Sequence, residues 1–278
     1  MSYLEQFINQ QNSEATKTTY RRGLVSFLET LETEDLPDRP SVEDVIAWKE
    51  WMATLSGWSD KTQATYWAAV RSYYDWLTRQ GIITLNPFLA VKSPRTLTNK
   101  TPNVPSEAAF TALMREADKC PTMDAAIVYA LASGLRESEV IDLQVEDVIN
   151  NGNTVILRVV GKGYKQRMVP LGEKASSRIF RWIGQMKYSD SGFVFMKDGR
   201  KLSRRQIQCV VSRICVKIGV TGVSPHSLRH HFATRMVRAG VDVFTLQKLL
   251  GHSSVSTTQI YVNMNTDDLV AAVAKDTM

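Results

Sequence analysis

Cysteine is scarce in this sequence, and long apolar runs are missing. Only three cysteines occur among 278 residues, Cys120, Cys209 and Cys215, and none forms a C-x-x-C pair. This usage argues against a disulfide framework and predicts three packing residues in a reducing compartment. No apolar segment approaches the roughly 18 residues that a membrane helix requires, and the first residues lack the segments of a signal peptide. We therefore expect a globular protein of the cytoplasm with no membrane partner.

Histidine is also rare, and its four copies are clustered. All four lie in two short segments, 226–234 and 250–261, which suggests a site. His226 and His230 have the i, i+4 spacing of a zinc helix, but Ser, Leu and Arg stand between them, and Arg229 would repel a cation. We expect no metal here, and we expect His230 and His231 to pack or to make structural hydrogen bonds.

Charge is unevenly distributed along the chain. Residues 1–91 hold 8 Lys/Arg and 12 Asp/Glu, whereas residues 92–278 hold 26 and 16, so the later part carries the positive charge. A basic surface attracts polyanions, of which nucleic acid is the commonest. Charge alone fits a merely solvated basic surface equally well.

A segment rich in Pro, Thr, Asn and Lys, residues 92–106, has no apolar period and is typical of an exposed linker. It separates residues 1–91 from 107–278. Before it, a helix start recurs at an offset of 46 residues, which predicts two similar capped helices with a third helix over 41–55 between them. The matching positions are Ser13, Thr16, Thr19 and Tyr20 with Ser59, Thr62, Thr65 and Tyr66. Five of the six tryptophans precede residue 80, and their helical spacing favours core packing over base stacking.

The later part combines helices with one hairpin. β-branched runs flank Gly161-Lys162-Gly163 within 153–172 and predict a β-hairpin with a lysine at its tip. The expected helices cover 107–118, 122–132, 137–143, 206–218, 227–239, 243–250 and a segment from about 256 onward. The fold class predicted from these patterns is mainly α with a small β-sheet, in two domains.

Four segments of the later part resemble the active-site segments of the tyrosine recombinase (phage integrase) family, in order and separation. They are SGLRESEV at 133–140, GKG at 161–163, HSLRHHFAT at 226–234 and LGHSSVSTTQIYVN at 250–263. The chain looks most like the simple Xer- and Cre-like members. The resemblance implies a helical, SAM-like core-binding domain at 1–91, a linker at 92–106 and an α+β catalytic domain at 107–278. It also implies site-specific DNA integration and recombination through a 3′-phosphotyrosine intermediate, with no cofactor.

By this resemblance, Tyr261 is the nucleophile, and Arg136 and Arg229 clamp the oxygens of the scissile phosphate. The chemistry agrees, because phosphoryl transfer places negative charge on those oxygens, to which guanidinium groups donate planar, permanently charged hydrogen bonds. A phenol with a pKa near 10 is a weak nucleophile and needs such neighbours. Glu139, three residues after Arg136, would orient an arginine or histidine rather than act as a base.

The remaining implied roles concern proton transfer. Lys162 resembles the general acid that protonates the leaving 5′ oxygen, with Lys165 as the alternative. His226 is the expected proton acceptor or relay at Tyr261, and His252 the expected donor to the phosphate, because imidazole serves either purpose near neutral pH.

The expected partner is a duplex DNA target site. The family implies strand exchange through a four-way (Holliday) junction on a homotetramer whose C-terminal helices, here carrying Leu269, Val270 and Val273, dock on neighbouring subunits; docking onto the same chain is the alternative. The basic residues expected to contact DNA, which could instead be only solvated surface charge, are Lys17, Arg21, Arg22, Arg200, Lys201, Arg204 and Arg205.

Two other functions compete with this interpretation. A topoisomerase-like or hairpin-forming enzyme would share the chemistry without the exchange. A DNA-binding regulator without activity would be expected to lack a catalytic residue, and none is missing. The target site and any accessory proteins leave no trace in the sequence.

Overall fold

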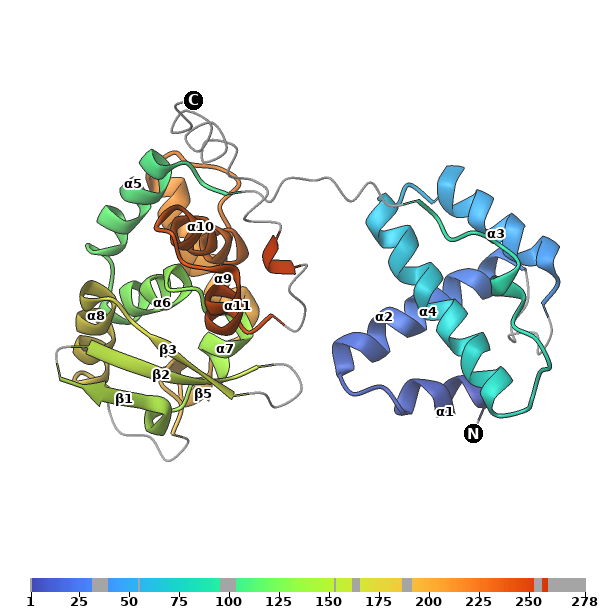
Figure 1. The fold of residues 1–278 in the computed structure, drawn as a ribbon, viewed down its shortest axis with the longest axis horizontal. Coiled ribbons are helices and arrows are strands. Elements are labelled where there is room, and N and C mark those ends of the chain that lie inside the picture. Colours follow the sequence, from blue (N-terminus) through green and yellow to red (C-terminus); the bar gives the residue numbers. More distant parts are fainter. Residues whose placement is uncertain are drawn as a thin grey trace, which may run out of the picture. The chain divides into compact units, whose positions relative to one another are not determined.

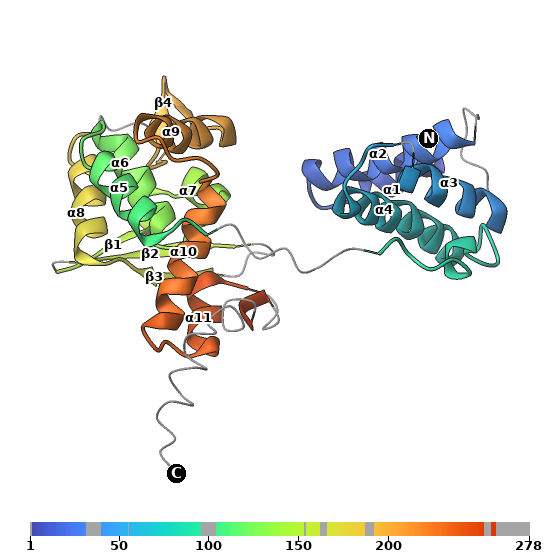
Figure 2. The ribbon, with the colours of Figure 1, turned by 90° about the horizontal axis from the view of Figure 1, so that it is seen from above.

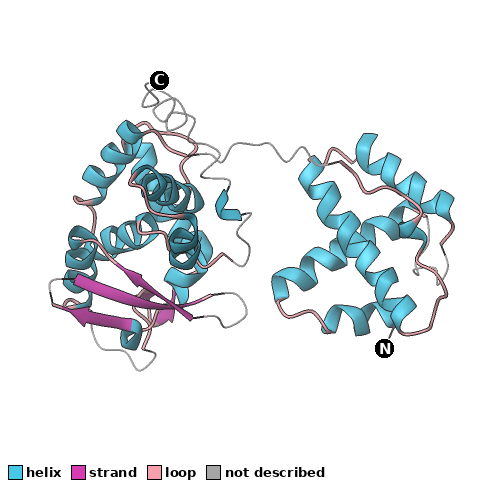
Figure 3. Cartoon of the chain, in the orientation of Figure 1, coloured by secondary structure: helices cyan, strands magenta, loops and turns pink. Residues whose placement is uncertain are grey.

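The computed structural model describes residues 2–31, 40–54, 56–95, 104–152, 154–161, 166–186, 192–252 and 257–259. The chain divides into two compact units, residues 1–100 and 101–278. Helices dominate both units, and the strands of the described residues lie in the second one (Figure 3). This agrees with the expected mainly helical fold with a small sheet. None of the helices in these ranges is long and apolar enough to span a bilayer.

The first unit is a helical bundle (Figure 1). Its elements are α1 (Tyr3–Asn9), α2 (Glu14–Thr30), α3 (Val42–Thr54), α4 (Asp60–Arg79) and the 3-10 turn η1 (Pro87–Leu89). The repeat seen in the sequence marks α2 and α4, whose N-caps Ser13 and Ser59 accept hydrogen bonds from the third residue on, at 3.1 and 3.3 Å. The two helices pack against each other where Gly23 approaches the Tyr66 backbone. The short helix α1 was not predicted.

The tryptophans of this unit pack in its core. Trp48, Trp67 and Trp76 are buried, and the Trp48 and Trp67 rings stack with centroids 5.8 Å apart. Trp51 and Trp58 are half-buried and meet edge to face. The expectation of core packing, rather than an exposed stacking surface, is thus confirmed for the buried three.

The second unit packs helices around a three-stranded antiparallel sheet of order β1-β2-β3. The strands are β1 (Val148–Asn151), β2 (Thr154–Val160) and β3 (Gln166–Pro170), with a small ribbon of β4 (Met196–Lys197) and β5 (Arg200–Lys201). The helices are α5 (Glu107–Ala117), α6 (Thr122–Ala132), α7 (Glu137–Asp142), α8 (Glu173–Ile183), α9 (Arg204–Lys217), α10 (Pro225–Arg238) and α11 (Val243–Leu250), with the 3-10 turn η2 (Val145–Asp147). In Figure 2 the sheet is seen nearly edge-on, with α6 and α8 on one side of it and α11 on the other. α8 packs against β2, and α11 against β3.

Most elements of this unit follow the sequence pattern. The predicted hairpin is β2 and β3, and the inward positions of β2, Val155, Leu157 and Val159, are buried. The sequence interpretation missed β1, α8 and the β4-β5 ribbon, and β1 is easily overlooked because only its first two residues are apolar. The helix expected from about 256 appears at residues 257–259, and the rest of it lies outside the described residues. One cysteine expectation was wrong: Cys209 is exposed on α9, whereas Cys215 is buried and Cys120 half-buried.

Candidate active site

Arg136 and Glu139 meet at the start of α7. The main-chain N–H of Arg136 donates to Glu139 Oε2 at 2.7 Å, so the carboxylate caps its own helix. The Arg136 guanidinium turns onto the same carboxylate, with Nη1 2.7 Å from Oε1. The arginine side chain is 32% exposed and that of the glutamate 2%. Arg136 therefore has one buried anchor and one accessible edge.

Arg229 is anchored differently, on α10, and is only 1% exposed. Its Nη1 donates to the carbonyl oxygen of Gly134 at 2.6 Å, in the turn between α6 and α7. Gly134 has φ +91°, and an added Cβ would lie 2.6 Å from a ring carbon of Phe232, so both the conformation and the space favour glycine. The turn that carries Arg136 is thereby fixed to the helix that carries Arg229.

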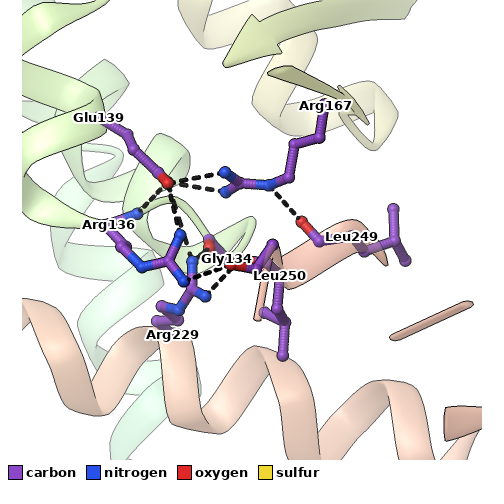
Figure 4. Close-up of polar contacts among 8 residues, drawn as sticks. Gly134, Arg136, Glu139, Arg167, Arg229, Leu249 and Leu250 are labelled. Atoms are coloured by element: carbon purple, nitrogen blue, oxygen red, sulfur yellow. Dashed lines mark hydrogen bonds and ion pairs between the residues drawn. The ribbon is translucent and has the colours of Figure 1, made fainter. Parts of the chain in front are cut away.

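Three arginines hold the C-terminal end of α11 (Figure 4). The last carbonyls of a helix lack partners within the helix and carry partial negative charge, so cations there are favourable. Three successive carbonyl oxygens each accept from a different arginine: Leu249 from Arg167 Nε (2.7 Å), Leu250 from Arg229 Nη2 (2.5 Å) and Gly251 from Arg136 Nη2 (2.7 Å). Segments distant in the sequence, α7, β3 and α10, thus converge where α11 ends.

Glu139 is the shared counter-ion of this cluster. Arg167 donates to both of its carboxylate oxygens at 2.7 Å, and Arg229 Nη1 lies 3.8 Å from Oε2. Burial raises the pKa of Glu139, but the hydrogen bonds and charge of Arg167, and then the main-chain and side-chain hydrogen bonds of Arg136, outweigh it and leave the pKa below its ordinary value. The group is therefore an anion at neutral pH and is unsuited to act as a base. Its contacts fit an orienting role, which stays a prediction.

His252 follows directly on the arginine-held end of α11. Its Nδ1 lies 2.9 Å from Thr258 Oγ1. Burial, followed by the charges of Arg229 and Arg136, lowers the pKa of His252 to about 4. The imidazole is therefore neutral at neutral pH and can present one N–H and one lone pair.

The other histidines lie on α10. His226 is exposed near its N-terminus, and its ring meets that of His230 edge to face with centroids 4.1 Å apart. Burial, then the charge of His226, lowers the pKa of His230 to about 4. His231 is buried, stacks on Phe110 at 3.9 Å and contacts the Pro105 carbonyl oxygen through Nδ1 at 3.2 Å, which confirms its packing role. Within the described ranges, no group of three His, Cys, Asp or Glu residues is placed to bind a metal ion.

Three residues central to the sequence interpretation lie outside the described residues. They are Tyr261, Lys162 and its alternative Lys165. Lys162 belongs to the connection between β2 and β3, and Tyr261 follows His252 by nine residues. Their roles stay predictions.

The basic residues expected to contact DNA fall into two groups. In the first unit, Lys17 pairs with Glu14 at 2.7 Å and Arg21 makes two bonds of 2.9 Å to Glu5, whereas Arg22 has no carboxylate partner among the described residues. In the second unit, Lys201 pairs with Asp142 at 2.7 Å, and the neighbouring exposed residues are Arg200, Arg204 and Arg205. Contact of either group with DNA is a prediction.

Arg167 is the site residue that sequence reasoning missed. On β3 the side chains of Gln166, Met168 and Pro170 are exposed, whereas Val169 is buried. Arg167 shares the inward side of the strand with Val169. A charged residue at an inward position of an alternating strand is unusual, and this was the available signal.

Comparisons with known proteins decide the family. The model of the phage integrase family matches residues 106–267, and the model of the phage integrase N-terminal SAM-like domain matches residues 1–81. The chain belongs to the phage integrase family. Among its relatives, the tyrosine recombinase XerC of Actinobacillus pleuropneumoniae serotype 7 (strain AP76) is 32% identical over 265 residues, which are 93% of this chain and 86% of the relative. XerC of Corynebacterium efficiens (strain DSM 44549) is 33% identical over 269 residues, 94% and 84% of the two chains.

Solved structures agree with this membership of the phage integrase family. The XerH site-specific recombinase bound to palindromic difH substrate, a post-cleavage complex, superposes with a TM-score of 0.77 at 20% identity, over 99% of this chain and 84% of that one. The XerA recombinase gives a TM-score of 0.56 at 28% identity, over 98% and 96%. This integrase-family protein is thus a tyrosine recombinase, an enzyme that cleaves and rejoins DNA at specific sites through a tyrosine intermediate.

Proposed function

We propose that Tyr261 attacks a phosphate of a duplex DNA target and forms a 3′-phosphotyrosine bond, while Arg136, Arg229 and His252 hold the phosphate oxygens. The observation that carries this proposal is the meeting of both arginines at the end of α11, where they bind the successive carbonyls of Leu250 and Gly251. His252 is the next residue, and Tyr261 follows on the same segment. The proposal therefore brings the nucleophile, nine residues after His252 in the sequence, to this cluster of fixed positive donors.

The arginines supply charge stabilisation in this scheme. Guanidinium groups fixed in advance cost no reorganisation when charge develops on the phosphate oxygens, and loss of one such donor typically lowers the rate by about 10²- to 10³-fold. Arg136 has an accessible edge, whereas Arg229 is 1% exposed. In the proposal both guanidinium groups supply positive charge to the same phosphate, Arg136 through its accessible edge and Arg229 from a buried position.

Proton transfer falls to His226 and Lys162 in the proposal, beside the hydrogen bond from His252. His226, exposed on α10, accepts the Tyr261 proton or relays it, and neutral His252 donates its N–H to the phosphate. Lys162, between β2 and β3, protonates the leaving 5′ oxygen. Because the phosphotyrosine ester conserves the energy of the broken bond, resealing reverses the same step and needs no nucleotide cofactor.

We further propose that the enzyme acts in the cytoplasm as a homotetramer on two DNA sites, passing through a Holliday junction. The apolar positions Leu269, Val270 and Val273 of the C-terminal segment support a docking role in a neighbouring subunit, and they lie outside the described residues. The basic residues Lys17, Arg21, Arg22, Arg200, Lys201, Arg204 and Arg205 are the proposed backbone contacts. The XerH site-specific recombinase, solved as a post-cleavage complex with palindromic difH substrate, supports a DNA target site as the partner.

The test begins with covalent capture. Purified protein is incubated in EDTA with a library of random duplexes, and DNA that stays attached after denaturation is sequenced to recover the site. We expect adducts with the wild-type protein and none with Tyr261→Phe. Adducts that persist in Tyr261→Phe, or that form only with a divalent metal, would contradict the proposal.

A plasmid assay with the recovered site then distinguishes recombination from topoisomerase-like relaxation. Two copies on one supercoiled plasmid should yield recombinant circles. Relaxation of a plasmid without sites, in the absence of exchange, would favour a topoisomerase-like enzyme instead. Analytical ultracentrifugation of the protein with its site, with and without the residues after 264, measures the assembly and the contribution of the C-terminal segment.

A further inference from the structure

Arg167 occupies a position that the proposed reaction does not account for. It lies on β3, in the strand that leads out of the connection carrying Lys162. Its side chain is 9% exposed and points inward from the sheet, beside buried Val169. A buried guanidinium is costly unless its charge is paired and its donors are used. The contacts of Arg167 should therefore explain why the residue is there.

The contacts of Arg167 join three elements (Figure 4). Nη1 and Nη2 each donate to one carboxylate oxygen of Glu139 on α7, both at 2.7 Å, in a planar two-bond pair. Nε donates to the carbonyl oxygen of Leu249 at the end of α11, also at 2.7 Å. The planar guanidinium of Arg167, anchored on β3, thus fixes the distance between Glu139 and the end of α11.

The proposed active site depends on both groups that Arg167 bonds, Glu139 and the end of α11. Glu139 orients Arg136 through a bond of 2.7 Å, and Leu249 lies three residues before His252. A displaced Glu139 would take Arg136 with it, and a displaced α11 end would move the carbonyl acceptors of Arg136 and Arg229 together with His252. Displacements of about 1 Å at a distance from the reacting atoms can cost about 10²-fold in rate.

We propose that Arg167 is a positioning residue of the recombinase: its bridge between Glu139 and the end of α11 holds Arg136, Arg229 and His252 in one arrangement around the phosphate. The inference rests on the proposed function of these three residues. In this scheme Arg167 acts through Glu139 and the end of α11, to which its Nε and both Nη atoms donate, and not on the DNA itself.

The variant Arg167→Met keeps the length and apolar stem of the side chain and removes every N–H. Its matched control is Arg158→Met on the neighbouring strand β2, where Val159 pairs with Arg167. Arg158 also holds a carboxylate, Asp147, at 2.7 Å, but this pair does not reach α7 or α11. Arg167→Lys retains the charge without the planar bridge, and it serves as the test if the methionine variant fails to fold.

The first measurement needs no DNA. Hydrogen exchange is followed at the amides of Gly251 and His252, both of which donate to the Gln247 carbonyl oxygen in the last turn of α11. We expect faster exchange there in Arg167→Met, an intermediate rate in Arg167→Lys, and the wild-type rate in Arg158→Met. Wild-type exchange in Arg167→Met would overturn the bridging role, whatever the protein does to DNA.

The second measurement is single-turnover cleavage of a nicked duplex that carries the site recovered by covalent capture. We expect Arg167→Met to form the covalent adduct about 10- to 100-fold more slowly than wild type at saturating protein, the range typical for groups that orient a reacting residue. The Kd for the duplex should stay at the wild-type value. A full cleavage rate in Arg167→Met, or an equal loss in Arg158→Met, would overturn the proposal.

The pH profile separates positioning from loss of stability. The charged groups that face Glu139 are Arg136, Arg167 and Arg229. Without Arg167 the carboxylate loses a major cause of its low pKa, and His252 loses one of the charges that lower its own pKa. The acid limb of the cleavage profile should therefore move to higher pH in Arg167→Met and stay in place in Arg158→Met. An acid limb that stays in place in Arg167→Met would count against positioning through Glu139. If wild-type protein formed no adduct, the proposed function would fail, and the exchange experiment would still report on the bridge.

Discussion

Gly251 leaves the space that the Arg167 guanidinium occupies. A Cβ added at Gly251 would lie 3.0 Å from Arg167 Cδ and 3.1 Å from Nη1, and the glycine has φ +63°. The same residue ends α11 in the left-handed conformation and presents its carbonyl oxygen to Arg136. A glycine at this position therefore serves the helix end and the arginine cluster together.

Gly251→Ala and Gly240→Ala form a matched pair. Both glycines follow a helix end at positive φ, but Gly240, with φ +79°, has no atom within 4 Å of an added Cβ. Each alanine should cost about 1 to 2 kcal/mol of unfolding free energy through backbone strain. Only Gly251→Ala should also slow DNA cleavage, because Arg167 must give way. Urea unfolding and single-turnover cleavage measure the two effects, and equal cleavage by both variants would contradict the close contact.

Gly134→Ala should be severely destabilising. The new Cβ would collide with Phe232 at 2.6 Å and would sit at φ +91°, so overpacking and backbone strain together predict a loss of about 3 kcal/mol or more. Phe232→Leu removes the ring, so the double variant should lose about 1 kcal/mol less unfolding free energy than the two single losses added together. A double-mutant cycle by urea unfolding tests this, and strict additivity would show that the ring simply moves aside.

Glu139→Gln should lower stability by about 3 kcal/mol near neutral pH, because it leaves buried arginine charge uncompensated. The folded-state pKa of Glu139 lies below its ordinary value of 4.5, so its stabilising contribution is present above that value and is lost as pH falls through the folded pKa. The difference in unfolding free energy between wild type and variant should therefore shrink below about pH 4.5. A difference that stays constant from pH 7 to pH 3 would show that the carboxylate does not ionise as the structure indicates.

His252 should remain neutral well below neutral pH in the protein without DNA. Its pKa is lowered to about 4, so the unfolded chain binds the proton more readily, and this group removes stability as pH falls from 6.5 toward 4. NMR titration of the ring Cε1–H measures the value directly. Arg136→Met should raise the pKa of His252, because the charge of Arg136 is one of the causes. A wild-type midpoint near 6.5 would place the ring in solvent, away from the arginines.

Local features of the fold could be predicted from the sequence. The caps Ser13 and Ser59 and the glycines that end α10 and α11 act within one helical turn, so neighbouring residues contain the information. The hairpin of β2 and β3 followed from its β-branched runs. The family resemblance selected Arg136, Arg229 and His252, because the order of the four segments is itself a property of the sequence.

Only the tertiary structure decided which residues share the site. Arg136 and Gly251 are 115 positions apart, and Arg229 and Gly134 are 95 apart, so no local pattern joins them. Arg167 carries no sequence signal beyond a charge on an inward strand position, and its role follows from the meeting of β3, α7 and α11. Helix caps and strand alternation depend on neighbours along the chain, whereas a shared counter-ion such as Glu139 depends on how separate elements pack.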